Sequence, residues 1–232
     1  MESSVNLVSC LPVGLNGELS NNPLKGYACV SSFVQIIACS VMAFEPTSFG
    51  ESAFILLRSL LGGLACEDGF IDWVDGLLAA ERFSKVKTLK RYGIGSCGCS
   101  LAIFLCFHEY AILTSLRDRV ALKAAITAGV IGHLTSMWHW ATAEHAYDIN
   151  VTWRFDRRDI IVWTVLMLSA LCYVYSWHRI TLLLLQQLVL LTSFNWLTYS
   201  LLGGRTGDSI GAINKLASIT SLMNLSNDNL AR

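Results

Sequence analysis

The chain has 232 residues, 53% of them hydrophobic, and a mean hydropathy of +0.50. This composition argues against an ordinary soluble domain, which is more polar at this length. Basic and acidic residues balance at 17 each, so no nucleic-acid partner is expected, because nucleic-acid binding requires a basic surface.

The apolar segments predict an all-α, polytopic membrane protein. A helix needs about 20 mostly apolar residues to cross a bilayer. Three segments near this length carry no charged residue: 27–44, 160–177 and 180–202. Three further apolar segments contain ionisable residues: 52–66, 98–116 and 120–140. We therefore expect about six transmembrane helices in one domain, residues 1–232, embedded in the lipid bilayer. The alternative is a soluble all-helical protein with a large core.

The distribution of basic residues predicts which segments between the spans face the cytoplasm. Of the 17 lysines and arginines, twelve fall in the odd-numbered segments outside the six spans, three in the even-numbered segments, and two within spans. The positive-inside rule places the odd-numbered segments and both termini in the cytoplasm, as in a bacterial-type inner membrane. The acidic stretch at 67–76 and the glycine-rich stretch at 203–212 are separated by four spans. Both are therefore expected on the cytoplasmic face, where they can form one site.

The sequence CEDGFIDWVDG, residues 66–76, places four carboxylates within nine residues. On a helix predicted over 67–90, Glu67 points about 100° away from the other three, which share an arc of about 60°: Asp68, Asp72 and Asp75. Carboxylates on one stripe repel one another unless a cation lies among them, and hard oxygen ligands suit Mg²⁺, Mn²⁺ or Ca²⁺. The alternative is an ordinary solvated helix face.

Basic residues follow the acidic stretch closely, and two of them are candidate phosphate ligands: Lys90 and Arg91. Carboxylates that hold a metal ion next to cations are typical of phosphoryl-transfer sites.

The second stretch is GGRTGDSIGA, residues 203–212. Successive glycines allow backbone N–H groups to converge on an anion, and an arginine can grip phosphate through two hydrogen bonds. The predicted phosphate-binding residues are Gly203, Gly204, Arg205, Thr206 and Gly207. Asp208 can complete a metal site or act as a base. The spacing is not that of a P-loop, and a flexible turn before a terminal amphipathic helix is the alternative.

Together the two stretches resemble the cobalamin synthase family, adenosylcobinamide-GDP ribazoletransferase. DGFIDWVDG at 68–76 is similar to the DG-L-A-D-x-x-DG part of the first family motif, and GGRTGDSIGA is similar to the family's GG-x-TGD-x-x-GA. RYGIGSCG at 91–98 is similar to D-S-R-x-G-x-x-G, and CLPVG at 10–14 to an N-terminal LP element. Because the motifs keep their order and separation, the resemblance covers nearly the whole chain.

The resemblance implies an integral membrane enzyme that depends on Mg²⁺. Such an enzyme joins adenosylcobinamide-GDP to alpha-ribazole, or to its 5′-phosphate, and releases GMP at the end of vitamin B12 assembly. It implies that the metal ligands are Asp68, Asp72 and Asp75, and that Asp208 is a further ligand or orients one. It leaves open whether the protein forms an oligomer.

The chain also departs from the family pattern. Cys66 stands at the family's histidine, and Arg91 and Gly93 stand at its aspartate and arginine. A family lysine aligns with Glu109 and a family arginine with Val130. A divergent, working enzyme is the first interpretation. The alternatives are a decayed homologue, a CDP-alcohol phosphotransferase, and a divalent-cation transporter whose mouth is the acidic stripe.

Four further residues within or near the predicted spans have structural interpretations. Glu109 is either a functional residue or a structural partner of Lys123. Arg58 is expected to snorkel or to pair with another helix. Trp138 and Trp140 are expected to anchor the membrane interface.

Overall fold

The computed structural model describes residues 23–45, 47–61, 64–78, 95–116, 118–144 and 157–230. Within these residues the chain forms eight helices and no strand, which confirms the predicted all-α class. The helices are α1 (Pro23–Phe44), α2 (Ser48–Leu61), α3 (Ala65–Leu78), α5 (Ser96–Ser115), α6 (Asp118–Thr142), α7 (Arg157–Val174), α8 (Trp177–Leu202) and α9 (Gly207–Leu230). Each predicted span overlaps at least one of them.

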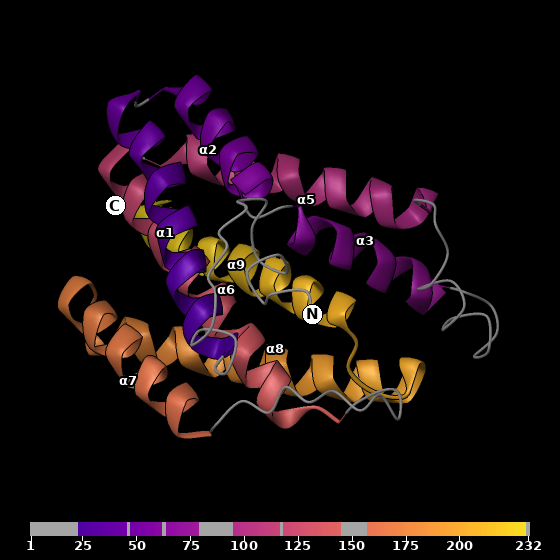
Figure 1. Ribbon diagram of the computed structural model, residues 1–232. Helices are drawn as coiled ribbons and strands as arrows, with labels where there is room; N and C mark the ends of the chain where they lie inside the picture. Colours follow the sequence, from indigo (N-terminus) through magenta and orange to yellow (C-terminus); the bar gives the residue numbers. More distant parts are fainter. Residues whose placement is uncertain are drawn as a thin grey trace.

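Helix α9 runs through the middle of the bundle and packs against α3, α5, α6 and α8 (Figure 1). Small side chains on its buried face, such as Ala212, Ala217 and Ser221, let neighbouring helices approach closely. On α6, a Cβ at Gly132 would lie 2.9 Å from the backbone oxygen of Asn214 on α9, so this contact requires glycine. The close packing fixes the start of α9 against its neighbours.

Among the described residues, three helical segments are each long and apolar enough to cross a membrane: Ser96–Ser115, Arg119–Thr142 and Trp177–Leu202. Helices α2 and α3 reach the same length and hydropathy only when taken together as one bent span. The three segments support the membrane class, but the count of six spans is not confirmed. Helix α7 has 18 residues and begins with three charged ones, RRD. Helix α1 has 22 residues, which is long enough to cross a bilayer.

The predicted span over 52–66 is divided into two helices. Helix α2 ends at Leu61 and α3 begins at Ala65, so the acidic stretch lies on its own helix. The sequence between them is Gly-Gly-Leu, and glycine disfavours a helix interior. Leu64 has a positive φ of 59° directly before α3. The helix predicted over 67–90 extends to Leu78, and the rest of that range lies outside the described residues.

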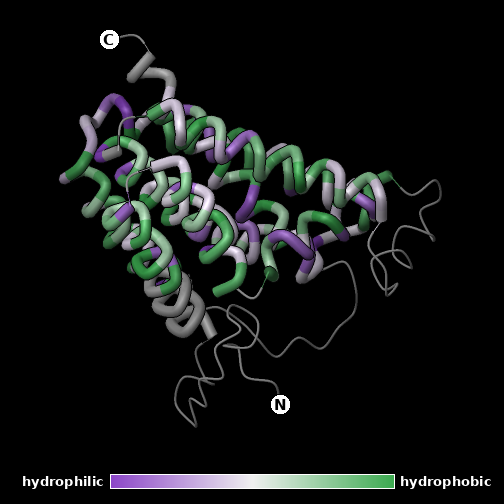
Figure 2. The backbone as a smooth tube through the Cα atoms, turned by 90° about the horizontal axis from the view of Figure 1, so that it is seen from above, coloured by the Kyte–Doolittle hydropathy of each residue, from purple (hydrophilic) through white to green (hydrophobic). Residues whose placement is uncertain are grey.

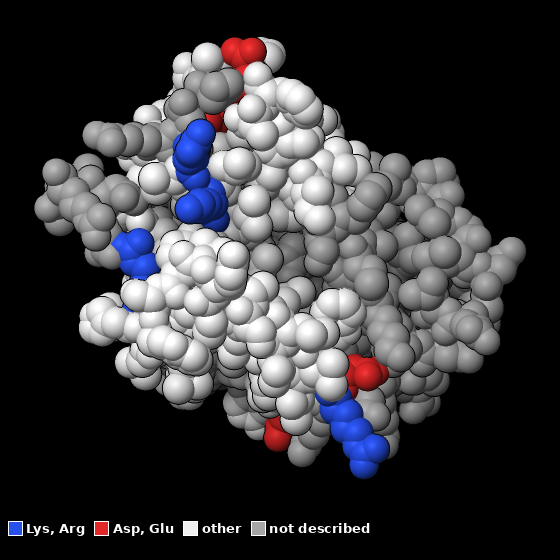
Figure 3. All heavy atoms as spheres, turned by 90° about the vertical axis from the view of Figure 1, so that its left-hand side faces the viewer, with Lys and Arg blue, Asp and Glu red and all other residues white. Residues whose placement is uncertain are grey.

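Large apolar side chains face outward on the helices that can span a membrane. Figure 2 shows hydrophobic colouring along the outer helices of the bundle, and the face drawn in Figure 3 carries few charged side chains among its described residues. Exposed apolar residues on α5 and α8 include Leu101, Phe104, Phe107, Leu185, Leu188 and Val189. A surface of this kind is unfavourable in water and suits contact with lipid.

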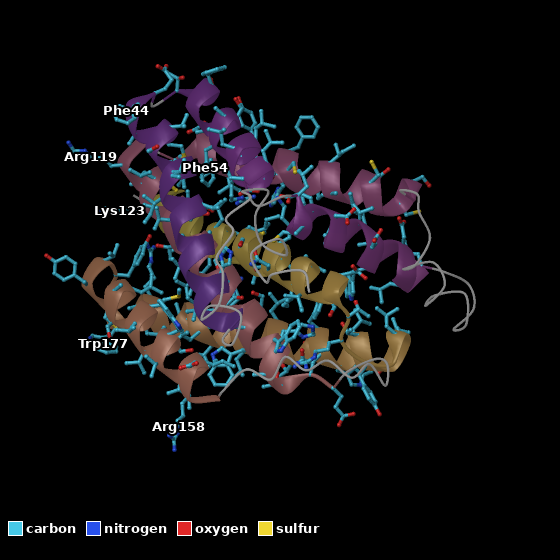
Figure 4. All side chains as sticks on the ribbon, in the orientation of Figure 1. Phe44, Phe54, Arg119, Lys123, Arg158 and Trp177 are labelled. Atoms are coloured by element: carbon cyan, nitrogen blue, oxygen red, sulfur yellow. The ribbon has the colours of Figure 1, made fainter. Side chains whose placement is uncertain are left out.

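The interior contains a buried charge network, defined as Arg58, Glu67, Glu109 and Lys215. Glu109 accepts two hydrogen bonds from Arg58, at 2.5 and 2.9 Å, and one from Lys215 at 3.2 Å. Lys215 also donates to Glu67 at 3.2 Å. The predicted pairing of Arg58 with another helix is thus confirmed. The predicted partner of Glu109 is wrong, because Lys123 is exposed at the left margin of the molecule (Figure 4).

Candidate active site

The acidic and glycine-rich stretches lie against each other, because α3 packs on the first turns of α9. A Cβ at Gly69 would lie 2.8 Å from the backbone oxygen of Asp208. A Cβ at Gly211 would lie 2.6 Å from the backbone oxygen of Ala65 and 3.1 Å from the Cα of Cys66. Glycine at both positions lets the two helix backbones touch. The two stretches therefore lie side by side, as a single site requires.

Carboxylates from both helices crowd together at this contact, and we call Asp68, Asp72 and Asp208 the carboxylate cluster. Burial raises the pKa of Asp72 from its ordinary 3.8 to about 6, and the negative charges of Asp68, Asp208 and Asp75 add to the shift. Burial also raises the pKa of Asp208, with a contribution from Asp68. Asp68 is exposed and Asp72 is half-buried, so the cluster faces solvent. Carboxylates that raise one another's pKa favour a cation or a proton among them.

Asp75, the third aspartate of the predicted stripe, has a structural partner as well. Its Oδ1 accepts a hydrogen bond of 2.8 Å from the backbone N–H of Gly98, in the first turn of α5. The carboxylate thereby caps α5, whose own N-cap residue is Gly95 and has no side chain to do so. A Cβ at Gly95 would overlap the Asp75 carboxylate. Asp75 contributes charge to the cluster while holding α5 in place.

The glycine-rich stretch ends α8 and begins α9. Gly203 and Gly204 have φ values of 87° and 141°, in the region that favours glycine, and Gly203 caps α8. Thr206 and Ser209 then form a reciprocal capping box. The N–H of Thr206 donates to Ser209 Oγ at 3.0 Å, and the N–H of Ser209 donates to Thr206 Oγ1 at 3.2 Å. Gly207 is different, because a Cβ there would meet nothing within 4 Å among the described atoms.

Arg205 is held against the end of α6. Its backbone N–H donates to the carbonyl oxygen of Glu144 at 2.6 Å, and its guanidinium lies 4.7 Å from the centre of the Trp140 ring. This cation–π contact fixes the guanidinium next to the start of α9. The two tryptophans predicted as interface anchors thus have protein partners, since Trp138 donates to Thr164 Oγ1 on α7 at 3.1 Å.

Sequence reasoning missed His139 of α6. The residue is completely buried, with Nε2 at 2.9 Å from Ser209 Oγ and Nδ1 at 2.5 Å from Asn195 Oδ1. The signal that could have found it was its position as an ionisable residue within an apolar segment.

Two predicted phosphate ligands, Lys90 and Arg91, lie outside the described residues, as does Gly93. In the described part of the chain, no group of three or more His, Cys, Asp or Glu side chains is placed so that it could hold a metal ion. Mg²⁺ commonly binds through one or two carboxylates together with water and substrate phosphates. The hard oxygens of the carboxylate cluster, and their mutual repulsion, fit a partial site of this kind.

Comparisons with known proteins agree with the resemblance. The family model described as Cobalamin-5-phosphate synthase matches residues 3–226. The adenosylcobinamide-GDP ribazoletransferase of Allorhizobium ampelinum is 27% identical over 96% of this chain and 94% of its own length. Relatives of the same name from Vibrio cholerae and Thermoanaerobacter pseudethanolicus are 25% and 24% identical, over 93% and 87% of this chain and 88% and 82% of their own lengths. No solved structure matches. The chain belongs to the cobalamin-5-phosphate synthase family.

Proposed function

We propose that the protein joins adenosylcobinamide-GDP to alpha-ribazole, or to its 5′-phosphate, and releases GMP. The products are adenosylcobalamin or its phosphate. The family match and the names of the relatives support this reaction. The observation that carries it is the contact between α3 and the start of α9, where the carboxylate cluster meets an open helix N-terminus. Phosphoryl transfer needs both a place for a metal ion and a place for phosphate.

The carboxylate cluster is the proposed Mg²⁺ site, in which one or two of Asp68, Asp72 and Asp208 would hold the ion together with substrate phosphates. A bound Mg²⁺ would neutralise negative charge on the pyrophosphate and on the departing GMP. Asp75 supports the site through its charge and through its cap on α5.

The start of α9 and the side chain of Arg205 are the proposed phosphate ligands. The first N–H groups of a helix carry partial positive charge, which favours an anion. The N–H of Ser209 is already bonded to Thr206 Oγ1, but Gly207 has no side chain and leaves space beside the first turn of the helix. Arg205, held by Trp140, can donate two hydrogen bonds to one phosphate.

In the proposed reaction, the 5′-hydroxyl oxygen of alpha-ribazole attacks the phosphorus that is attached to the cobinamide. A new P–O bond forms, and the bond from that phosphorus to the bridging oxygen of the pyrophosphate breaks, so GMP leaves. The hydroxyl proton passes to a carboxylate of the cluster. The protein's main contribution is to position both substrates and to stabilise charge.

We further propose that this site lies at the cytoplasmic face of a bacterial-type inner membrane, on the basis of the charge distribution along the chain. A cation transporter would need carboxylates within the membrane that are available to the ion. Glu109 lies within a helix that can span the membrane, but its carboxylate is already paired with Arg58 and Lys215. The family match gives no support to a CDP-alcohol phosphotransferase.

The direct test is to incubate membranes that contain the protein with adenosylcobinamide-GDP, alpha-ribazole and Mg²⁺. We expect equal amounts of adenosylcobalamin and GMP, and no product when Mg²⁺ is chelated. Membranes that contain folded protein but yield no cobalamin would contradict the proposal, and would favour the decayed homologue.

A further inference from the structure

The last turn of α6 is joined to the start of α9 through His139. The ring is completely buried and stands edge-on to Phe194 of α8, with ring centres 5.2 Å apart. One nitrogen contacts Asn195 on α8 and the other contacts Ser209 on α9. A buried polar ring with both nitrogens partnered is strongly fixed in orientation.

The hydrogen-bond chain assigns the tautomer of this ring. Asn195 Nδ2 donates to Thr142 Oγ1 at 3.0 Å, and the Thr142 hydroxyl donates to the carbonyl oxygen of Trp138 at 2.7 Å. Asn195 therefore presents its amide oxygen to His139, so Nδ1 carries the proton. In a neutral imidazole, Nε2 is then an acceptor. The Ser209 hydroxyl lies 2.9 Å from this nitrogen and 2.8 Å from the carbonyl oxygen of Thr206, so both can accept its proton.

Ser209 is the residue that closes the capping box with Thr206. Between these two residues lie Gly207 and Asp208, which carry the open N-terminus and one carboxylate of the cluster. The contact with His139 holds the Ser209 hydroxyl in place. Because this hydroxyl is bonded to the backbone of Thr206, the contact also fixes the backbone N–H groups of this turn. Trp140, the neighbour of His139, contacts Arg205 on the other side of the same loop.

We propose that His139 is a positioning residue, which acts through Ser209 to hold the loop at 203–209 in the conformation that binds the phosphates of adenosylcobinamide-GDP. The proposal rests on the proposed function. His139 does not itself touch the substrate, because it is completely buried behind Ser209.

Two variants separate the two hydrogen bonds of His139. In His139→Asn the side-chain amide can replace Nδ1, which keeps the contact with Asn195 and loses the one with Ser209. In His139→Gln the longer amide can replace Nε2, which keeps the contact with Ser209. We expect His139→Asn to lower kcat/KM for adenosylcobinamide-GDP about 10- to 100-fold, since small displacements of a site have costs of this order. The loss in His139→Gln should be clearly smaller.

The kinetic pattern distinguishes positioning from general destabilisation. Loss of folded protein lowers the apparent kcat and leaves both KM values unchanged. Loss of the loop conformation should raise the KM for adenosylcobinamide-GDP and leave the KM for alpha-ribazole unchanged. Equal losses in the Asn and Gln variants, or unchanged KM values, would overturn the proposal.

Ser209→Ala provides a test that does not depend on tolerance of changes at position 139. It should raise the same KM, because it removes the contact with His139 together with the capping-box contacts of the Ser209 hydroxyl. The Ser209→Ala/His139→Asn double variant should then lose little more than Ser209→Ala alone. Normal KM values in Ser209→Ala, or additive losses in the double variant, would overturn the proposal. Absence of transferase activity in the wild-type protein would instead contradict the proposed function.

Discussion

Gly69 on α3 lies against the backbone of Asp208 on α9, so closely that a Cβ at residue 69 would be 2.8 Å from the Asp208 oxygen. This contact joins the acidic stretch to the glycine-rich stretch, which lies far away along the chain. The position of the carboxylate cluster depends on it. The glycine that follows Asp68 is therefore explained by helix packing, in addition to any role in ligand approach.

Replacement of Gly69 by alanine should force α3 and α9 apart. Overpacking of a close contact costs about 1–3 kcal/mol, so we expect a lower unfolding temperature in detergent and a loss of transferase activity. Gly207→Ala is the matched control for stability, because a Cβ there meets no described atom within 4 Å. An unchanged unfolding temperature in Gly69→Ala would show that the helices do not pack as described.

Replacement of Asp72 by asparagine should relieve charge repulsion when no metal is bound. The folded-state pKa of Asp72 is raised from 3.8 to about 6. Its protonated form therefore stabilises the fold below about pH 4, and this contribution is lost as the pH rises through 6. In the presence of a chelator, the unfolding temperature of the wild type should fall relative to that of Asp72→Asn between pH 4 and pH 7. Parallel pH profiles for the two proteins would contradict this account of the cluster.

The cap that Asp75 provides for α5 predicts different results for two substitutions. Asp75→Ala removes the acceptor for the Gly98 N–H and should cost about 1 kcal/mol of stability, as loss of a helix cap does. Asp75→Asn keeps an acceptor oxygen and should cost less. Thermal unfolding monitored by circular dichroism compares the two variants. If both are as stable as the wild type, the cap contributes nothing.

Removing one charge of the buried charge network should lower the stability of the fold more than removing an oppositely charged pair. Glu109→Ala leaves Arg58 and Lys215 with Glu67 alone, and removal of one partner of a buried pair costs about 3–5 kcal/mol. The double variant Arg58→Met/Glu109→Leu removes a whole pair and keeps Lys215 with Glu67, so it should be more stable than Glu109→Ala.

The unfolding temperatures of the wild type, Glu109→Ala and Arg58→Met/Glu109→Leu measure this difference. Lys123→Ala, at an exposed position, is the control, with an expected change within about 0.5 kcal/mol. A double variant that is less stable than Glu109→Ala would mean that the network stabilises the fold by direct attraction.

The sequence alone was sufficient for the helical class. It indicated that the two motifs can form one site, through a count of spans that the structure does not confirm. The hydropathy and length of the apolar segments indicate helices directly, and the spacing of Asp68, Asp72 and Asp75 indicates one stripe. The division of the span over 52–66 into α2 and α3 was less accessible, since hydropathy does not distinguish one span from two short helices joined by glycines.

Contacts between distant segments were not predictable in the same way. Lys123 was a reasonable partner for Glu109 because it lies in the next span, but the structure supplies Arg58 and Lys215 from elsewhere in the chain. The capping role of Asp75 and the placement of Trp140 under Arg205 also depend on tertiary packing. His139 has no local motif around it, so its role became visible when α6, α8 and α9 were placed together.

The most direct test of the central claim is release of GMP from adenosylcobinamide-GDP by equal amounts of folded wild type, Asp72→Asn and Asp208→Asn. The assay contains alpha-ribazole and is run with and without Mg²⁺. We expect Mg²⁺-dependent release by the wild type, and release at least about 100-fold slower by both variants, because charge stabilisation at such sites accounts for factors of this size. Full activity in either variant would contradict the assignment of the carboxylate cluster as the phosphotransfer site.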